Sequence, residues 1–205
     1  MPDFLELTHY RRQVAKLYEK VRDESVPILE RFAYFKEIRN ELFKSHTQSP
    51  LNLEQKESFE GLEYFPYNPN YRFELRPDTH VETETFEIPL RDDGALRLER
   101  VATVTLTLAN PVKLSLFWLK SYGGGLFLPF RDATNETETY GGGRYLLDTI
   151  KHTDLGHKSG RLILDFNFSY NPSCAYNSAW DCPLAPYENR LELPLFVGEK
   201  KFGEA

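Results

Sequence analysis

The chain has 205 residues, of which 40% are apolar and 14% aromatic, and its formal net charge at pH 7 is −6. This length allows one domain with a sizeable core, or a domain with a small helical appendage, and the excess of phenylalanine and tyrosine suits a folded, β-rich core better than a disordered tail. No nucleic acid is expected as a partner, because the charged residues form no clustered basic block.

The start of the chain is predicted to carry no targeting signal. The segment MPDFLELTHYRRQ lacks the long apolar stretch that follows a basic segment in a secretory signal peptide. No run in the sequence approaches the ~20 apolar residues of a membrane helix. We therefore expect a soluble, cytoplasmic protein with no membrane partner.

Three helices are predicted in the first third of the chain. An apolar stripe of helical period over residues 10–21 predicts the first helix, with Thr8 as its N-cap. A second helix is predicted over about 28–43. Asn52 precedes Gln55 by three residues, which is close to a capping box and predicts a short third helix.

From residue 62 onward the apolar period changes to two, which predicts strands. The segment DDGA is expected to form a hairpin turn of the Asp-Gly type. Most connections are short, and short turns favour antiparallel neighbours. The nine predicted strands are LEYFPY, YRFELR, VETETFEIPL, LRLERVATVTLTL, VKLSLFWL, LFLPF, RYLLDTI, RLILDFNFSY and RLELPLFVGEK.

These patterns predict a mainly β protein, an antiparallel β-barrel or β-sandwich of about nine strands with N-terminal helices. We divide it into an N-terminal helical segment, 1–48, and an antiparallel β domain, 49–205, that carries the polar site. Two connections, about 130–143 and 170–189, are too long for hairpins. Long loops of this kind in compact domains are usually functional or disordered, and their many Asn, Pro, Cys, Tyr and Trp residues argue against disorder.

A triplet of glycines, Gly141, Gly142 and Gly143, lies in the first long connection, and a similar triplet lies at 123–125. One interpretation is a pair of tight turns where backbones crowd. The other is that the backbone N–H groups of the second triplet form an anion-holding concavity beside Arg144. No nucleotide-binding glycine motif is present.

Two further patterns in the long connections are polar. Arg131 and Asp132 form either an ordinary surface pair or a preorganised pair at a cleft. Asp165 and Asn167 fall on one face of a predicted strand, pointing either into water or into a polar cavity. The loop after this strand is also consistent with a rigid strap that closes one end of the β structure.

The two cysteines, Cys174 and Cys182, are eight residues apart, a spacing that matches no common zinc site. They could serve as disulfide partners, as metal ligands or as small buried apolar residues, and in the cytoplasm they are expected to be reduced. We predict no metal and no cofactor.

The longest motifs resemble an uncharacterised prokaryotic family, the domain of unknown function sixteen eighty-four, over roughly residues 30–201. The resemblance lies in the blocks GLEYFPY, LFLPFRDATNETETYGGGRYLLD and LDFNFSYNPSCAYNSAWDCPLAPYENRLELPLFVGEK. The family has no established activity to transfer. The resemblance implies only that these polar residues belong to one site.

Two functions follow as hypotheses. In the first, the 130–144 and 165–189 loops bind a small anionic or polar metabolite, and if the site is catalytic, hydrolysis or isomerisation fits best. In the second, the same residues only lock the loops of a non-catalytic binding or structural module together. The candidate catalytic residues are Arg131, Asp132, Tyr140, Arg144 and Asp165. The candidate substrate-binding residues are Thr134, Thr139, Gly141, Gly142, Gly143, Asn167, Tyr170, Asn171, Cys174, Cys182 and Asn189.

Overall fold

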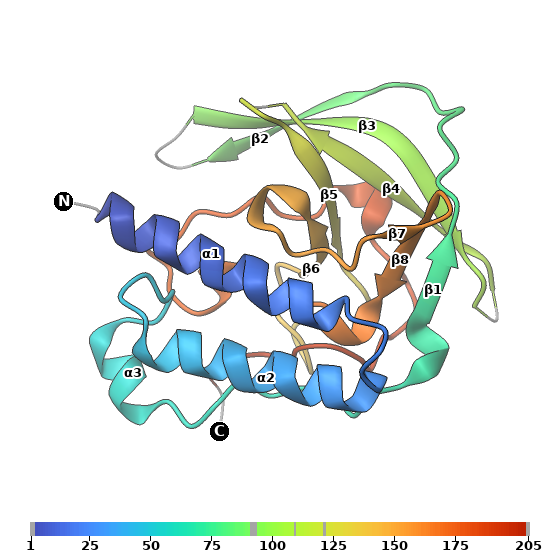
Figure 1. Cartoon of the computed structure of the whole chain (residues 1–205). Coiled ribbons are helices and arrows are strands. Elements are labelled where there is room, and N and C mark those ends of the chain that lie inside the picture. Colours follow the sequence, from blue (N-terminus) through green and yellow to red (C-terminus); the bar gives the residue numbers. More distant parts are fainter. Residues whose placement is uncertain (1–2, 91–93, 109, 121, 204–205) are drawn as a thin grey trace.

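The computed structural model describes residues 3–90, 94–108, 110–120 and 122–203, and within them three α-helices precede the strands (Figure 1). The helices are α1 (Phe4–Val21), α2 (Ile28–Ser45) and α3 (Leu53–Ser58). The capping box of α3 is confirmed, because Asn52 and Gln55 exchange side-chain and backbone hydrogen bonds. The predicted N-cap of α1 is wrong: Asp3 caps the helix one turn earlier, and the Thr8 hydroxyl donates to the Phe4 carbonyl inside it.

Eight strands of the described residues form two antiparallel sheets, so the protein is mainly β. The five-stranded sheet has the order β2-β3-β4-β5-β6, and the three-stranded sheet has the order β1-β8-β7. The strands are β1 (Arg72–Leu75), β2 (Thr85–Leu90), β3 (Gly94–Leu106), β4 (Val112–Leu119), β5 (Gly125–Phe130), β6 (Arg144–Asp148), β7 (His157–Lys158) and β8 (Arg161–Asp165). The described residues form no closed barrel.

Two predicted strands are not formed, for a reason that lies in their prolines. The segments around Tyr64 and Glu199 run side by side and meet in a single antiparallel bridge. Phe65 N–H donates to the Gly198 carbonyl beside it. Pro66 and Pro194 lack the N–H that a longer ladder needs.

Of two other predictions about strands, one differs from the structure and one falls largely outside the described residues. The predicted strand over 161–170 ends at Asp165, whose side chain accepts from the backbone N–H of Asn167 and caps the 3-10 turn η3 (Phe166–Phe168). The Asp-Gly turn falls largely on residues 91–93, outside the described part of the chain, although β2 and β3 pair up to Leu90 and Gly94 on either side of it.

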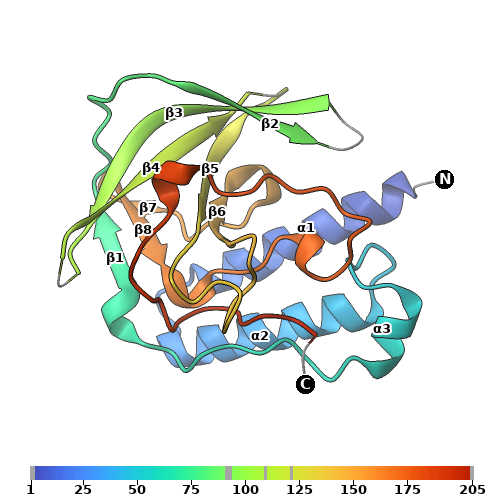
Figure 2. The same ribbon diagram turned by 180° about the vertical axis from the view of Figure 1, so that it is seen from behind.

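The molecule has layers, with the two long helices on one side and the five-stranded sheet on the other (Figures 1 and 2). The largest hydrophobic core lies between the sheets and combines residues of both, such as Phe73 of β1 and Leu128 of β5. A second core joins α1 and α2 to Phe168 of η3 through Phe32 and Phe35. The helices therefore pack on the chain segment that follows β8. Within the described residues, no helix is both long and apolar enough to cross a membrane.

Candidate small-molecule site

Arg144 and Asp132 form a fully buried ion pair, with 2.7 Å between Arg144 Nη2 and Asp132 Oδ2. Arg144 also donates to the backbone carbonyls of Val197 and Leu195. The Asp132 Oδ1 atom accepts from Thr134 N–H, from the Thr134 hydroxyl and from Leu195 N–H. The pair therefore ties the start of β6 to the C-terminal segment. Both Nη atoms of Arg144 are engaged within the protein, and its buried Nε has no partner in the described chain. These bonds favour a structural role for Arg144 over the predicted role as a ligand anchor. We call this pair the Asp132–Arg144 lock.

The glycine triplet at 141–143 allows close backbone packing. Gly143 has φ = +91°, and a Cβ atom on it would lie 2.5 Å from the carbonyl oxygen of Phe130. The N–H of Gly143 donates to the Tyr140 carbonyl. A Cβ on Gly141 would meet the side chain of Glu136. This geometry agrees with the interpretation of the triplet as a tight turn, and it gives no sign of an anion-holding concavity.

The other candidate residues of the first connection also bond within the protein. The Thr134 and Thr139 hydroxyls are 2.9 Å apart and buried. Arg131 keeps a quarter of its side chain exposed and lies 3.8 Å from the Glu136 carboxylate. Tyr140 donates its hydroxyl to the Cys174 sulfur over 3.6 Å. The 140 and 170 regions thus meet, as predicted, but they meet as packed segments.

Asp165, Asn167 and Asn189 hold backbone segments in place. Asp165 accepts from the Tyr67 hydroxyl over 2.8 Å and from the Asn167 side chain over 2.7 Å. Burial raises the pKa of Asp165, and these hydrogen bonds oppose that shift. Asn167 pairs with both backbone groups of Asn68. Asn189 is fully buried, accepts from Ser115 N–H, and donates to the carbonyls of Ser115 and Pro129.

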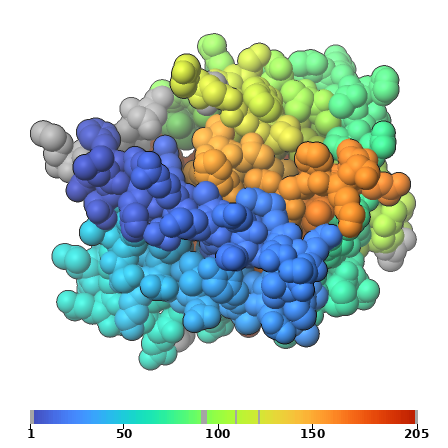
Figure 3. Space-filling view, in the orientation of Figure 1, coloured from blue at the N-terminus to red at the C-terminus, as the bar shows by residue number. Residues whose placement is uncertain are grey.

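A cavity of about 480 Å³ lies between α1, α2 and the 170–182 segment, and we call it the helix–loop cavity. In Figure 3 the surface is recessed where α1, in blue, faces the orange segment around residue 150. Its volume falls within the ~300–1,000 Å³ range of small-molecule sites. Six aromatic side chains line it: Tyr10, Phe43, Tyr145, Tyr170, Tyr176 and Trp180.

Other hollows in the described part of the chain are less suited to a ligand. The hollow beside Asp165 has a volume of only about 10 Å³, room for about one water molecule. Two larger ones, of about 460 and 620 Å³, lie where β4 begins and at Arg76–His80. They are lined by eight and six residues, whereas twenty line the helix–loop cavity. The helix–loop cavity is therefore the candidate site.

A buried polar network forms one wall of the helix–loop cavity. The Arg39 Nη2 atom donates to the Glu199 carboxylate over 2.8 Å, and its Nε atom donates to the Tyr64 hydroxyl over 2.8 Å. Tyr176 donates its hydroxyl to the same carboxylate. Burial raises the pKa of Glu199, and the Arg39 charge opposes that shift. Arg39 itself lines the cavity, so its guanidinium borders the space that a ligand would occupy.

Asn171 supplies an unused polar group in the same wall. Its backbone N–H donates to Glu199, and its side-chain amide donates to the Lys200 carbonyl over 2.7 Å. That bond fixes the orientation of the amide. The Oδ1 atom is buried and has no partner within the described chain. An unsatisfied buried acceptor costs about 1–3 kcal/mol, which a donor group on a ligand would recover.

The two cysteines lie at the other end of this wall. Both are free and half-buried, and Cys182 lines the cavity. The backbone N–H of Cys174 donates to the Cys182 sulfur over 3.3 Å. Lys151 lines the same cavity, with about half of its side chain exposed.

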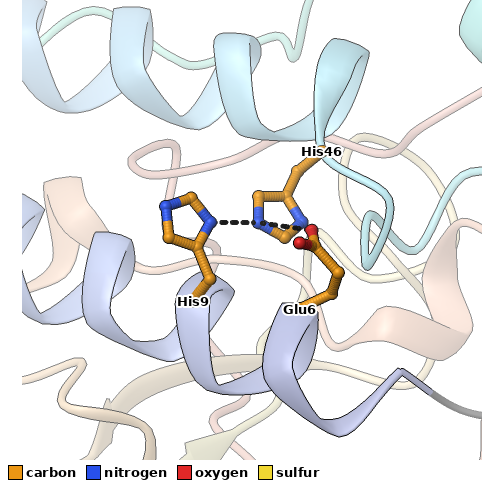
Figure 4. A group of neighbouring side chains, drawn as sticks. All are labelled: Glu6, His9 and His46. Atoms are coloured by element: carbon orange, nitrogen blue, oxygen red, sulfur yellow. Dashed lines mark hydrogen bonds and ion pairs between the residues drawn. The ribbon is translucent and has the colours of Figure 1, made fainter.

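One cluster near the outer end of α1 has metal-donor atoms, formed by Glu6, His9 and His46 (Figure 4). His9 Nδ1 and His46 Nε2 are 2.9 Å apart, and the Glu6 carboxylate lies 4.0 Å from His46 Nε2. Gln48 N–H donates to His46 Nδ1, so a neutral His46 ring carries its proton on Nε2. Nε2 is the atom that would have to face a metal. The cluster therefore fits a hydrogen-bonded link between α1 and the end of α2 better than a metal site.

Burial lowers the pKa of His46, the nearby Glu6 charge opposes this shift, and His9 and Lys56 add to it. Protonating Nδ1 would also place its N–H against the N–H of Gln48. The link between the helices is thus built for the neutral ring.

Of the candidate residues, the structure places Tyr170, Asn171 and Cys182 in the wall of the helix–loop cavity and leaves the others out of it. Sequence reasoning missed Arg39, Glu199 and Tyr176. A signal for Arg39 was present, because the spacing of Phe32, Phe35 and Arg39 puts this charge on the buried stripe of α2. A buried charge needs a partner, and Glu199 provides it.

The chain belongs to the family described as Protein of unknown function (DUF1684), whose model matches residues 57–200. The chain is similar to an uncharacterised protein of Haloarcula marismortui with a structure solved by NMR in solution. The two are 33% identical, with a TM-score of 0.60, over 84% of this chain and 93% of that one. No curated protein is significantly similar to the chain.

Proposed function

We propose that the protein binds a small anionic molecule with an aromatic or apolar body in the helix–loop cavity. The observation that carries this proposal is a roomy aromatic cavity whose wall holds the guanidinium of Arg39 and a buried acceptor, Asn171 Oδ1, that has no partner within the described chain. The proposal assigns binding and no reaction. It combines the two sequence-based hypotheses: the 130–144 loop serves as a lock, and the 170–182 segment serves as a binding wall.

Charge in the cavity wall favours an anion. Arg11, Arg39 and Lys151 line it, against one lining carboxylate, Asp181. Glu199 neutralises Arg39 in the free protein, and Lys151 lies 3.7 Å from the Asp148 carboxylate. Arg11, which is exposed, and Asp181 are the remaining lining charges, and they oppose each other. A carboxylate is therefore expected to interact with the guanidinium groups of Arg11 and Arg39.

The aromatic walls favour a flat apolar body. Arg39 lies over the rings of Phe43 and Tyr170 at 5.1 and 5.2 Å, so its guanidinium plane continues the aromatic surface. Burying apolar ligand surface contributes about 25 cal/mol per Å². Burial of the ring thus supplies affinity, while the cationic groups and Asn171 supply orientation.

Calorimetric titration with naphthaleneacetate tests this proposal, with naphthaleneethanol as the neutral control ligand. We expect the acid to bind at least tenfold more tightly than the alcohol. Ala179→Phe, at an exposed lining position, should abolish binding without loss of fold. Ala133→Phe, at an exposed alanine outside the cavity wall, should leave it unchanged. Equal binding by both variants would rule out the helix–loop cavity as the site.

A further inference from the structure

Two cysteines lie close together beside the helix–loop cavity. Cys174 lies in the 3-10 turn η4 (Ser173–Ala175), and Cys182 lines the cavity. The Cys174 backbone N–H donates to the Cys182 sulfur over 3.3 Å, and each thiol shifts the pKa of the other. Neither cysteine is buried in apolar packing, as an inert structural cysteine would be. The pair is therefore placed for chemistry at the cavity wall.

The surroundings of Cys182 stabilise a thiolate. The hydrogen bond from the Cys174 thiol lowers the pKa of Cys182 to about 7, against the opposing effect of burial. The backbone N–H groups of Cys174 and Ser173 and the charge of Lys151 act in the same direction. Cys182 thus has the features of a nucleophilic cysteine, which are a polar, electropositive and partly exposed environment.

Cys174 has the complementary features. Its hydrogen bond to Cys182 raises its pKa, so it holds the shared proton while Cys182 is a thiolate. The Tyr140 hydroxyl donates to the Cys174 sulfur over 3.6 Å. Once Cys182 loses its negative charge, the main cause of the raised pKa of Cys174 disappears. The Tyr140 hydroxyl then remains as a hydrogen-bond donor to a developing Cys174 thiolate. The geometry thus fits a first and a second thiol acting in sequence.

We propose that Cys182 and Cys174 form a redox-active dithiol that reacts with low-molecular-weight disulfides at the wall of the helix–loop cavity. This inference goes beyond the proposed binding function and does not depend on it.

The chemistry balances in two exchange steps. The Cys182 thiolate attacks one sulfur of a disulfide RSSR, a Cys182–SR bond forms, the S–S bond of RSSR breaks, and RS⁻ leaves and takes a proton from solvent. The Cys174 sulfur then attacks the Cys182 sulfur, losing its proton to solvent, and a second RS⁻ leaves and is protonated. The two protein thiols lose two electrons to form one disulfide. The reagent RSSR gains them and becomes two RSH molecules.

The expected rate follows from the fraction of thiolate and its reactivity. At pH 7 a thiol of pKa about 7 is half ionised, while one of pKa ~8.5 is only ~3% ionised, a difference of about 15-fold. Intrinsic nucleophilicity falls with pKa by about fivefold over the same interval. Cys182 should therefore react about threefold faster than an ordinary exposed thiol. It should also react faster than Cys174, whose pKa is raised.

Reaction with glutathione disulfide, followed by intact-protein mass spectrometry, tests the proposal. The wild type should form an internal disulfide and retain no glutathione. Cys174→Ala should stop at a mixed disulfide on Cys182. Cys182→Ala should react more slowly than the wild type at pH 7, because it lacks the thiol whose pKa is lowered. Thermal unfolding of each variant establishes that it is folded before its rate is used.

A second measurement is the pH dependence of iodoacetamide alkylation, read peptide by peptide. The Cys182 rate in the wild type should rise with a midpoint near 7, and Cys174→Ala should move that midpoint upward because the donating thiol is gone. Cys174→Ser, which keeps a donor, should move it less. Equal rates at the two cysteines, a wild type that keeps glutathione bound, or no reaction would each overturn the proposal.

Discussion

Replacing Arg144 by alanine removes the cation of the Asp132–Arg144 lock and should destabilise the protein severely. Both side chains of this ion pair are fully buried. The variant leaves the Asp132 carboxylate buried with donors from Thr134 and Leu195 only, and it leaves the carbonyls of Leu195 and Val197 without the guanidinium. Breaking a buried pair costs about 3–5 kcal/mol, and the surviving donors to Asp132 place the expected loss near 4 kcal/mol.

This loss converts into a melting temperature through the size of the protein. At ~2.1 cal/mol/K per residue, 205 residues have an unfolding entropy of about 0.43 kcal/mol/K. A loss of about 4 kcal/mol therefore lowers Tm by about 9 °C. Differential scanning calorimetry measures both quantities in one experiment.

Arg97→Ala is the matched control, because Arg97 also forms an ion pair, with Glu87, but with 64% of its side chain exposed. We expect it to cost less than about 1 kcal/mol. If Arg144→Ala and Arg97→Ala melt within two degrees of each other, the Asp132–Arg144 pair is not a structural lock. The interpretation of Arg144 as a ligand anchor would then return.

Two further predictions concern stability. The unfolding free energy should fall as the pH decreases from about 7.5 to about 5, because burial lowers the pKa of His46 in the folded state and the unfolded chain, with a His pKa of ~6.5, binds the proton more readily. The contribution of His46 to stability is complete above the unfolded pKa. In chemical denaturation, His46→Gln should therefore make the pH dependence of the unfolding free energy shallower. Gly143→Ala should cost at least about 2 kcal/mol, since it combines a positive φ with a clash against the Phe130 carbonyl, whereas Gly123→Ala, which has φ = +86° and open space around it, should cost about 1 kcal/mol. Equal losses for the two glycine variants would show that the close approach at Gly143 is unimportant.

Local patterns in the sequence predicted the helices and most strands because each depends on neighbours in the chain. The Asn52–Gln55 capping box was recognisable for this reason. The start of α1 was misplaced because its first turn is exposed and carries no buried apolar stripe, so only the side chain of Asp3 indicates it. The strand predicted over 161–170 ends early because the side chain of Asp165 caps a turn. The alternating apolar residues around Asp165 gave no indication of that turn in the sequence.

The candidate site was harder to predict, because polar residue types do not reveal what surrounds them. The sequence alone suggests a ligand-binding role for Arg144, Asp132 and Asn189. In the structure, however, their partners are backbone groups and side chains from distant segments. The helix–loop cavity depends on the packing of Tyr10 and Arg39 against the 170–182 segment. No local pattern encodes that contact. In the sequence, only the charge of Arg39 on the buried stripe of α2 indicated a polar group in the wall of this cavity.

The location of the binding site is tested most directly by amide NMR chemical shifts during titration with naphthaleneacetate. We predict the largest changes at Val14, Ser173 and Cys182, which line the helix–loop cavity. The amides of Arg131 and Gly142 should hardly move. Changes concentrated at Arg131 and Gly142, with none along the cavity, would contradict the account.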